Sequence, residues 1–574
     1  MTKSLSDPIQ AEPDGRMGHR TGLPVDRKVF AVAAALAVGF VVWGAISPDK
    51  MGDLTDKAMS WVTASFGWLF VLTSGAFVLF SAYLALSRYG NIKLGADDAV
   101  PEFSKFSWVS MMFATGMGIG LMFYGVAEPL YHLNGPPMGM AEPGTPEAAQ
   151  LAMEYTFFHW GFHPWAMYAV IGLSIGYFAY RKRHGNLVSG AFRPLLGKLV
   201  DRTPGKAIDV VAIFATLFGS ATSLGLGALQ ITGGIDRVFG SGRDSKWLAV
   251  GVIAFLTACF VLSAVSGIER GVKWLSNANA VAAALLALFL FVVGPTVFIL
   301  GTFTESLGGY LTHLPTMSFR DGVFDNEVSG PWLSAWTIFY WAWWISWTPF
   351  VGMFIARISK GRTIREFVVY VILVPSLVSF IWFSILGGAA FDLQLNQGKD
   401  MAAVVDAGME GALFETLGSY PLGTVTSALA VFLIAIFFVT GADSASIVMG
   451  MLSQKGCEEP RRGLTVFWGV TTGAVAAVLL WSGGLKALQT LVILVAGPFM
   501  LVLIAMCIST FKSLREEPYE STLPPRVRRA VLHAQRHDRL QHQTIALATL
   551  GCDGFDDGEA PNSDTPKIVV AVDD

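Results

Sequence analysis

The sequence predicts an all-α integral membrane protein with twelve transmembrane helices. Of its 574 residues, 53% are hydrophobic and 14% are charged, whereas roughly 25% of the residues are charged in an average soluble domain. Apolar runs long enough to cross a bilayer core of about 30 Å recur along the chain. The segments between them alternate between rich and poor in Lys and Arg, as expected when successive loops lie on opposite sides of a membrane.

Twelve apolar runs separated by charged or turn-forming residues define the spans. They lie near residues 29–46, 59–87, 104–126, 156–180, 207–236, 247–267, 275–302, 332–356, 366–388, 425–453, 462–482 and 487–511. With the N-terminus in the cytoplasm, the inner segments contain 24 Lys and Arg residues and the outer loops contain 7, the C-terminal tail excluded. Because cytoplasmic loops are enriched in Lys and Arg, we predict a multi-pass protein of the cell membrane with both termini in the cytoplasm.

The segments outside the spans differ in composition. We predict a polar N-terminal segment over 1–28, a membrane domain over 29–511, a basic tail over 512–550 that could be helical, and an acidic, disordered tail over 551–574. Residues 187–200 and 303–317 look amphipathic and are expected to lie along the membrane interface. The arginines at 526, 528 and 529 are either an ordinary cytoplasmic flank or part of a segment that senses anionic lipids.

Three alternating glycines interrupt the apolar pattern of the third span, in the stretch ATGMGIGLMFYGVAEP from Ala114 to Pro129. Each glycine is unfavourable inside a helix by roughly 1 kcal/mol relative to alanine. They are either a close-packing face between helices or a locally unwound segment. Because the spacing of Gly116, Gly118 and Gly120 puts them on more than one helix face, we predict unwound backbone, which is tolerated at membrane depth only where it lines a cavity.

Aromatic residues crowd two further spans, in the stretches FHWGFHPWAMY (158–168) and YWAWWISWTP (340–349). The four tryptophans of the second stretch lie in mid-span, away from the interfaces where Trp usually gathers. Neither stretch contains Asp or Glu. Aromatic faces attract a quaternary ammonium ion, which has no N–H groups to desolvate, by about 0.5–2 kcal/mol per ring. Backbone N–H groups of the unwound glycine segment could receive a carboxylate, so the residues predict a site for a methylated zwitterion.

Two other sets of side chains are candidates for binding ions. His159 and His163 have an H-x3-H spacing that can hold a metal, but no second pair lies in a span, so structural histidines are expected. Oxygen ligands suit hard cations such as sodium, although Ser and Thr also serve helix contacts in membranes. The fifth and tenth spans offer Thr216, Ser220, Thr222, Ser223, Thr440, Asp443, Ser444 and Ser446.

Three stretches resemble the betaine/carnitine/choline transporter family: GMGIGLMFYGVAEP, FHWGFHPWAMY and WTIFYWAWWISWTPFVGMFIARISKGRTIREF (336–367). The resemblance covers about residues 25–515. It implies a LeuT-type core in which spans 3–7 and spans 8–12 form inverted repeats, preceded by two additional helices. It also implies a homotrimer that packs through an amphipathic helix, for which 303–317 is the candidate.

The resemblance also assigns roles to single residues. It implies an aromatic box of Trp160, Trp165, Tyr168 and Trp344 beside the backbone of Gly116, Met117, Gly118 and Gly120. A path toward the cytoplasm would follow Phe339, Trp343, Trp347 and Phe354. One sodium ion is expected near Ala114, Met117 and Thr440, and a second near Thr216, Ser220 and Phe350. Gly441 stands where sodium-coupled members carry Ser, which weakens one ion site. Gly120 stands where choline-preferring relatives carry an acidic residue, which favours a zwitterion.

The predicted function is therefore sodium-driven import of glycine betaine or a related compatible solute, by alternating access around the aromatic box, with a role in osmotic stress as a hypothesis. A proton-coupled choline or carnitine carrier of the same family is the alternative. An enzyme is not predicted, since it would need a catalytic constellation and only the isolated pair of His159 and His163 offers one. A channel would need a continuous polar pore, which a Trp-lined path argues against. The expected partners are the substrate, sodium, membrane lipids and copies of the chain, without nucleic acid, cofactor or any metal besides sodium. The choice among betaine, ectoine, proline betaine, carnitine and choline stays open.

Overall fold

The structure is a computed structural model that describes residues 23–524 apart from Met117, 240–245 and 267–268, and then only Val527, Arg528, Ala530, Val531 and Ala534. The predictions for residues 1–22 and 535–574 lie outside the described residues. Within the described part, all regular elements are helical, and one isolated bridge pairs Lys93 with Thr363.

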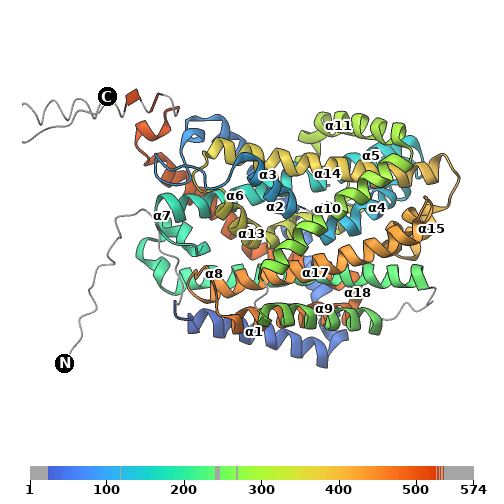
Figure 1. The fold of residues 1–574 in the computed structure, drawn as a ribbon, viewed down its shortest axis with the longest axis horizontal. Helices are drawn as coiled ribbons and strands as arrows, with labels where there is room; N and C mark the ends of the chain where they lie inside the picture. Colours follow the sequence, from blue (N-terminus) through green and yellow to red (C-terminus); the bar gives the residue numbers. More distant parts are fainter. Residues whose placement is uncertain are drawn as a thin grey trace, which may run out of the picture. The chain divides into compact units, whose positions relative to one another are not determined.

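Eighteen α-helices form the described part of the chain (Figure 1). They are α1 (Arg27–Ile46), α2 (Pro48–Leu86), α3 (Lys105–Gly116), α4 (Ile119–Asn134), α5 (Pro146–Trp160), α6 (Phe162–Gly176), α7 (Arg193–Leu196), α8 (Thr203–Phe239), α9 (Lys246–Ser266), α10 (Glu269–Val293), α11 (Thr296–Phe319), α12 (Asn326–Leu333), α13 (Phe339–Ile358), α14 (Ile364–Leu395), α15 (Met401–Ala407), α16 (Ala412–Gly418), α17 (Gly423–Ser453) and α18 (Arg462–Arg515). The long helices α8, α17 and α18 pack against one another, and α13 packs against α6, α8 and α18.

Eight helices of the described part are long and apolar enough to cross a membrane: α1, α2, α8, α9, α10, α14, α17 and α18. Each of the twelve predicted spans lies largely within helix, but several coincide with helices that are broken or merged. The third span is divided between α3 and α4, and the fourth between α5 and α6. The last two spans are both contained in α18, whose backbone is non-helical at Gly484. Twelve crossings therefore stay a prediction, whereas the described residues are all-helical and include eight helices able to cross a membrane.

Some boundaries differ from those that the sequence predicts. The seventh span was expected to reach residue 302, but α10 ends at Val293 and Pro295 precedes α11. Proline cannot donate the backbone hydrogen bond that would continue a helix. The stretch 303–317 is therefore the main part of α11. Residues 187–200 form three short helical segments, Val188–Phe192, Arg193–Leu196 and Gly197–Asp201, and their place at the membrane interface stays a prediction.

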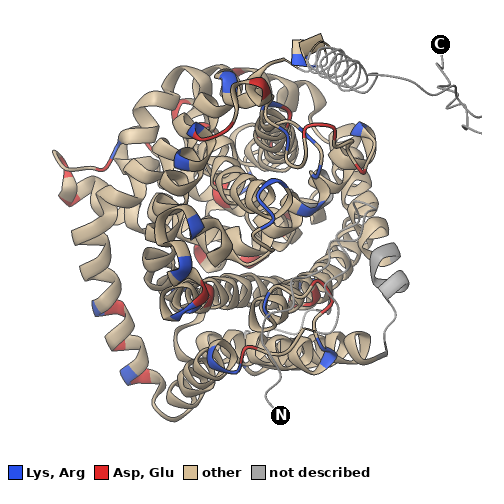
Figure 2. Cartoon of the chain, turned by 90° about the vertical axis from the view of Figure 1, so that its left-hand side faces the viewer, with Lys and Arg blue, Asp and Glu red and all other residues tan. Residues whose placement is uncertain are grey.

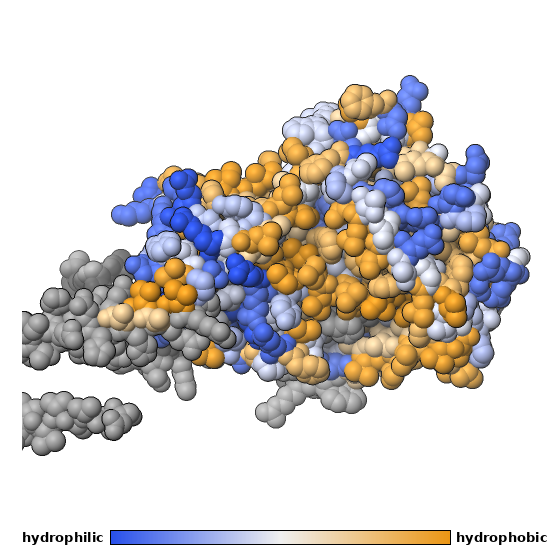
Figure 3. Space-filling model, turned by 90° about the horizontal axis from the view of Figure 1, so that it is seen from above, coloured by the Kyte–Doolittle hydropathy of each residue, from blue (hydrophilic) through white to orange (hydrophobic). Residues whose placement is uncertain are grey.

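The surface has the composition of a membrane-embedded protein. Large apolar side chains are exposed on α2, α9 and α10, among them Trp61, Trp247, Leu262 and Val292. Figure 3 shows apolar residues over the central part of one face and hydrophilic residues toward its two ends. Figure 2 shows Lys, Arg, Asp and Glu mainly on loops and helix ends. Contiguous apolar surface of this extent is rare on soluble monomers and is what lipid-facing helices present.

An ion-paired cluster joins the end of α18 to the residues that follow α6. Glu517 accepts hydrogen bonds from Arg181 (2.7 Å) and Tyr177 (2.6 Å) and pairs with Lys182 (2.8 Å). Arg181 also pairs with Asp97, at 3.0 Å. Although burial acts to raise the pKa of Glu517, the hydrogen bonds from these three side chains lower it to about 2. The Glu517 carboxylate is therefore charged at any physiological pH.

Replacing Arg181 by methionine is expected to lower the melting temperature of the detergent-solubilised protein by several degrees. The reason is that the Glu517 side chain, only 2% exposed, would lose its main charged partner. Because the folded-state pKa is depressed below the ordinary 4.5, the stabilisation is complete above pH 4.5 and is lost as the pH falls toward 2. The wild-type protein should thus keep this stabilisation unchanged between pH 5 and 8. The control is Arg193→Met, whose partner Asp201 is 61% exposed; equal losses in the two variants would contradict the expectation.

Candidate functional site

Interrupted helices meet around a small cavity in the membrane domain. The first turn of α4, the last residue of α5, the first turns of α6 and the middle of α13 form its wall, together with one residue of α14. The lining residues are Gly118, Ile119, Gly120, Leu121, Trp160, Pro164, Trp165, Tyr168, Trp343, Trp344, Trp347, Val351 and Ser379. None of these lining residues is charged.

The glycine run opens one side of the cavity. Helix α3 ends at Gly116, Gly118 is extended with a φ of −169°, and α4 begins at Ile119. The helix is thus interrupted where the glycine spacing predicts. The first backbone N–H groups of a helix have no partner within that helix, and the first turn of α4 lines the cavity. A Cβ atom at Gly120 would lie 2.8 Å from ring atoms of both Trp160 and Trp343, so glycine is needed for two indoles to approach the backbone.

A second interruption positions the aromatic residues of the fourth predicted span. Gly161 has φ and ψ of −95° and −128°, which end α5 and allow α6 to begin at Phe162. Trp160 is the last residue of α5, and Trp165 and Tyr168 lie in the first two turns of α6. The chain therefore brings side chains from two differently directed helices to one cavity wall.

The four residues predicted to form an aromatic box line this one cavity, and each is less than 10% exposed. The rings of Trp160 and Trp344 meet edge to face, with centroids 4.8 Å apart and planes at 75°. Tyr168 lies 5.3 Å from Trp165 and 6.4 Å from Trp344, again edge to face. Trp343 stacks on Trp344 at 4.9 Å.

The indole N–H groups of Trp343, Trp344 and Trp347 in this wall bond to oxygen atoms of the protein. Trp344 donates to the backbone oxygen of His159 (2.9 Å) and Trp347 to that of Gly219 (2.9 Å). Trp343 donates to the Ser223 hydroxyl at 3.3 Å. With their N–H groups so occupied, these rings offer the cavity their π-systems rather than hydrogen-bond donors.

Two of the four predicted path residues line the cavity, and the other two lie away from it. Trp343 and Trp347 line the cavity itself. Phe339 is fully buried and stacks on Trp343 at 5.6 Å, behind the wall. Phe354 is 38% exposed and does not line the cavity.

The predicted ion-binding residues that the structure describes are spread over four helices, and Thr216, Ser220, Phe350 and Thr440 do not line the cavity. Thr216 and Ser220 are buried on α8, and the Thr216 hydroxyl donates to the Ala212 oxygen at 2.9 Å. The ring of Phe350 on α13 packs edge to face against that of Trp347, with centroids 5.6 Å apart. Thr440 is half-buried on α17 and donates to the Ile436 oxygen at 2.9 Å. Ala114 belongs to α3, and Met117 lies outside the described residues.

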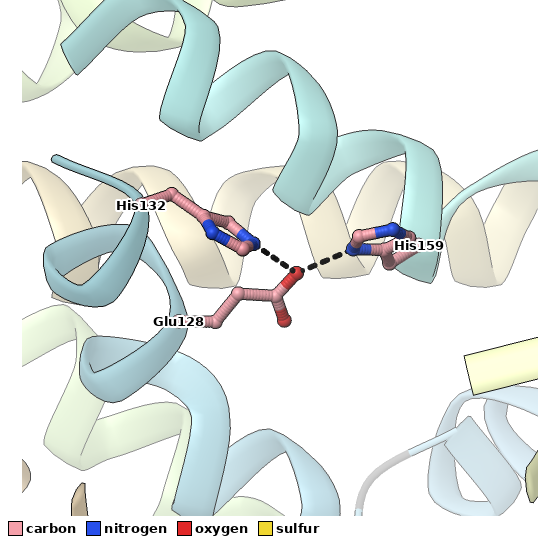
Figure 4. Close-up of side chains that lie close together, drawn as sticks. All are labelled: Glu128, His132 and His159. Carbon is pink, nitrogen blue, oxygen red and sulfur yellow. Dashed lines mark hydrogen bonds and ion pairs between the residues drawn. The ribbon is translucent and has the colours of Figure 1, made fainter. Parts of the chain in front are cut away.

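A buried cluster of titratable side chains beside the cavity was missed by the sequence analysis. Glu128 of α4 is fully buried; its carboxyl oxygens accept from Trp160 Nε1 (2.7 Å) and from the Tyr340 hydroxyl, and lie 2.7 Å from His159 Nδ1. His132, one turn later on α4, places its Nε2 atom 3.6 Å from the same carboxyl group (Figure 4). The signal was present, because Glu128 and His132 have the i, i+4 spacing of one helix face, but the third span was predicted to end at residue 126.

The ligand atoms of Glu128, His132 and His159 lie within 4.8 Å of one another, close enough to hold a metal ion. The carboxyl group of Glu128 bonds to Trp160, Tyr340 and His159, whereas neither ring nitrogen of His132 has a hydrogen-bond partner within the described residues. His163 is not part of this cluster, since its ring stacks on Trp341 at 5.0 Å. The H-x3-H pair therefore does not converge on a common site.

Sequence comparison identifies the family. The model of the "BCCT, betaine/carnitine/choline family transporter" family matches residues 28–519. The chain is 48% identical to the glycine betaine transporter OpuD of Bacillus subtilis, over 86% of this chain and 95% of that protein. It is 47% identical to a probable glycine betaine transporter of Desulfitobacterium hafniense (86% and 99%) and 41% identical to the betaine/ectoine transporter LcoP of Corynebacterium glutamicum (87% and 79%). The chain is therefore a membrane transporter rather than an enzyme, and it belongs to the betaine/carnitine/choline transporter family.

Proposed function

We propose that this protein imports glycine betaine or a closely related quaternary-ammonium zwitterion, with sodium as the coupling ion. The observation that carries the proposal is the cavity on which Trp160, Trp165, Tyr168 and Trp344 converge without any charged lining residue. Such a cavity suits a cation whose charge is spread over methyl groups, because the rings attract it and no ammonium N–H is left unsatisfied.

The start of α4 supports binding of the carboxylate end of the proposed substrate. Gly118, Ile119 and Gly120 line the same cavity, so the positive end of the helix dipole and its first N–H groups face the ligand. A carboxylate bound there would sit opposite the ammonium group in the aromatic box. The names of the three relatives, two of glycine betaine transporters and one of a betaine/ectoine transporter, favour the same chemistry.

We further propose the transport cycle that the family resemblance implies. Spans 3–7 and 8–12 would form two inverted repeats that move against each other, exposing the cavity first to one side of the membrane and then to the other. Trp343, Trp347, Phe339 and Phe354 would follow the cytoplasmic path. In this proposal both termini are cytoplasmic, lipids surround the exposed apolar helices, and a homotrimer packs through α11.

Uptake into proteoliposomes tests the proposal. Labelled glycine betaine, ectoine, choline and carnitine would each be offered under an inward sodium gradient and, separately, under a proton gradient at equal membrane potential. We expect accumulation of glycine betaine with sodium and little with protons alone. Uptake that is indifferent to sodium would overturn the coupling, and preference for choline over glycine betaine would overturn the substrate.

Gly441 offers a sharper test of the sodium site. A Cβ atom at this position would meet nothing within 4 Å, so a serine fits and adds an oxygen next to Thr440. Gly441→Ser is expected to lower the sodium concentration for half-maximal uptake several-fold, since hard cations bind oxygen ligands. Gly441→Ala, which fits equally well but adds no oxygen, is the control. A sodium dependence that is the same in both variants would argue against an ion site at Thr440.

A further inference from the structure

The carboxyl group of Glu128 does not line the cavity, yet it bonds to one of the rings that do. We propose that Glu128 and His159 form a positioning centre that holds the indoles of Trp160 and Trp344 edge to face, with their planes at 75°, in the arrangement that receives the ammonium group. The inference rests on the proposed function, because it assigns to these two residues the geometry of the proposed box.

Glu128 connects three of the helices that build the cavity wall. From α4, its Oε2 atom accepts the Trp160 Nε1–H of α5 at 2.7 Å and the hydroxyl of Tyr340 on α13. Its Oε1 atom lies 2.7 Å from His159 Nδ1, also on α5. One carboxyl group thus fixes the ring of Trp160 and the end of α5 relative to α4 and α13.

His159 extends this control to the opposite ring. Its Nε2 atom lies 3.0 Å from the Thr337 hydroxyl, and its ring stacks on that of Tyr340 at 4.7 Å. The backbone oxygen of His159 accepts the Trp344 Nε1–H at 2.9 Å. Glu128 therefore acts on Trp160 directly and on Trp344 through His159.

Burial makes these bonds hard to replace. Glu128, His159, Tyr340 and Thr337 are at most 1% exposed, so water cannot substitute for a lost acceptor. A buried donor without a partner carries a large free-energy penalty, and the Trp160 ring would turn to find another acceptor. The backbone at Gly120 limits that movement on the ring's other side. The two indoles consequently have one well-defined orientation only while the carboxyl group is present.

The test compares an apolar and a polar replacement of Glu128 in the proteoliposome assay. Glu128→Met keeps the length of the side chain but removes the acceptor, and should raise the KM for glycine betaine at least about tenfold while Vmax changes less than about threefold. Glu128→Gln should stay within about threefold of the wild-type KM. Its amide oxygen can accept from Trp160 and Tyr340 while its NH₂ group donates to His159 Nδ1.

Glu154→Met is the matched control. Glu154 is also buried on α5, where it bonds to Gln150 and His313, and it does not line the cavity. Its replacement should leave the KM unchanged. A wild-type KM in Glu128→Met would overturn the inference, and so would an equal loss in Glu128→Gln, because charge rather than hydrogen-bond acceptance would then be responsible.

If Glu128→Met does not fold, a milder variant tests the same inference. Thr337→Val preserves shape but removes the partner of His159 Nε2, and should raise the KM about threefold; an unchanged KM would overturn the inference. Trp344→Ala in the same assay distinguishes failure of the positioning inference from failure of the proposed function. If Trp344→Ala keeps full affinity, the proposed box is wrong. If it loses affinity while Thr337→Val and Glu128→Met do not, only the positioning role is wrong.

Discussion

Replacing Trp344 by alanine is expected to weaken the affinity for glycine betaine about thirtyfold. A close aromatic face contributes up to about 2 kcal/mol to cation binding, and 1.4 kcal/mol corresponds to a factor of ten in affinity. The loss should reach the upper end of this range, because Trp344 also supports two neighbouring rings, Trp160 at 4.8 Å and Trp343 at 4.9 Å. Without it, both neighbours lose a packing surface.

The measurement is equilibrium binding of labelled glycine betaine to the purified protein, with uptake in proteoliposomes as a second readout. Trp344→Phe retains an aromatic face and should lose less affinity than Trp344→Ala. Trp468→Ala removes a fully buried indole of α18 that does not line the cavity, and should lower stability without changing affinity. Full affinity in Trp344→Ala would contradict the proposed box.

The second large effect is expected at Gly120. Alanine at this position would place its Cβ atom 2.8 Å from ring atoms of both Trp160 and Trp343, closer than van der Waals contact allows. Neither ring can simply retreat, because Trp160 is bonded to Glu128 and Trp343 to Ser223. We expect uptake of glycine betaine to fall at least about tenfold, through displaced rings and a displaced start of α4.

The control for Gly120→Ala is Gly251→Ala in α9. A Cβ atom at Gly251 meets nothing within 4 Å, so alanine should be accommodated and should slightly favour the helix. Uptake at the wild-type rate in Gly120→Ala would mean that the Trp160 and Trp343 rings can shift without loss of function. The narrow approach of the indoles to the backbone would then have no role in binding.

The sequence was most informative where residue types conflict with an ordinary membrane helix. Alternating glycines in an apolar span predicted the interruption between α3 and α4, and tryptophans away from the interfaces pointed to an internal cavity. The resemblance to a family then named the individual box residues, which do line one cavity. Their role in binding the substrate, like that of the residues assigned to sodium, stays a prediction.

Features that depend on burial could not be predicted in the same way. The third span was predicted to end at residue 126, before Glu128 and Pro129; a carboxyl group is costly in the membrane and proline disrupts helices. The helix continues to Asn134 because Glu128 finds hydrogen-bond partners on two other helices, α5 and α13. The i, i+4 spacing of Glu128 and His132 marks a shared helix face, but a single sequence does not reveal partners that lie 32 and 212 residues away along the chain.

The position of Glu517 affects how the C-terminal tail should be removed in any study of osmotic activation. The predicted last span ends at residue 511, so a truncation soon after this residue would be an obvious choice. A cut after residue 515 would also delete the carboxylate that Arg181, Lys182 and Tyr177 share. These three residues directly follow α6, the helix that carries Trp165 and Tyr168. A protein that ends at residue 515 could thus lose activity because α6 is held less firmly, and this loss could be mistaken for the loss of an osmotic sensor. A protein that ends after residue 517 keeps the carboxylate, so its activity would report on the tail alone.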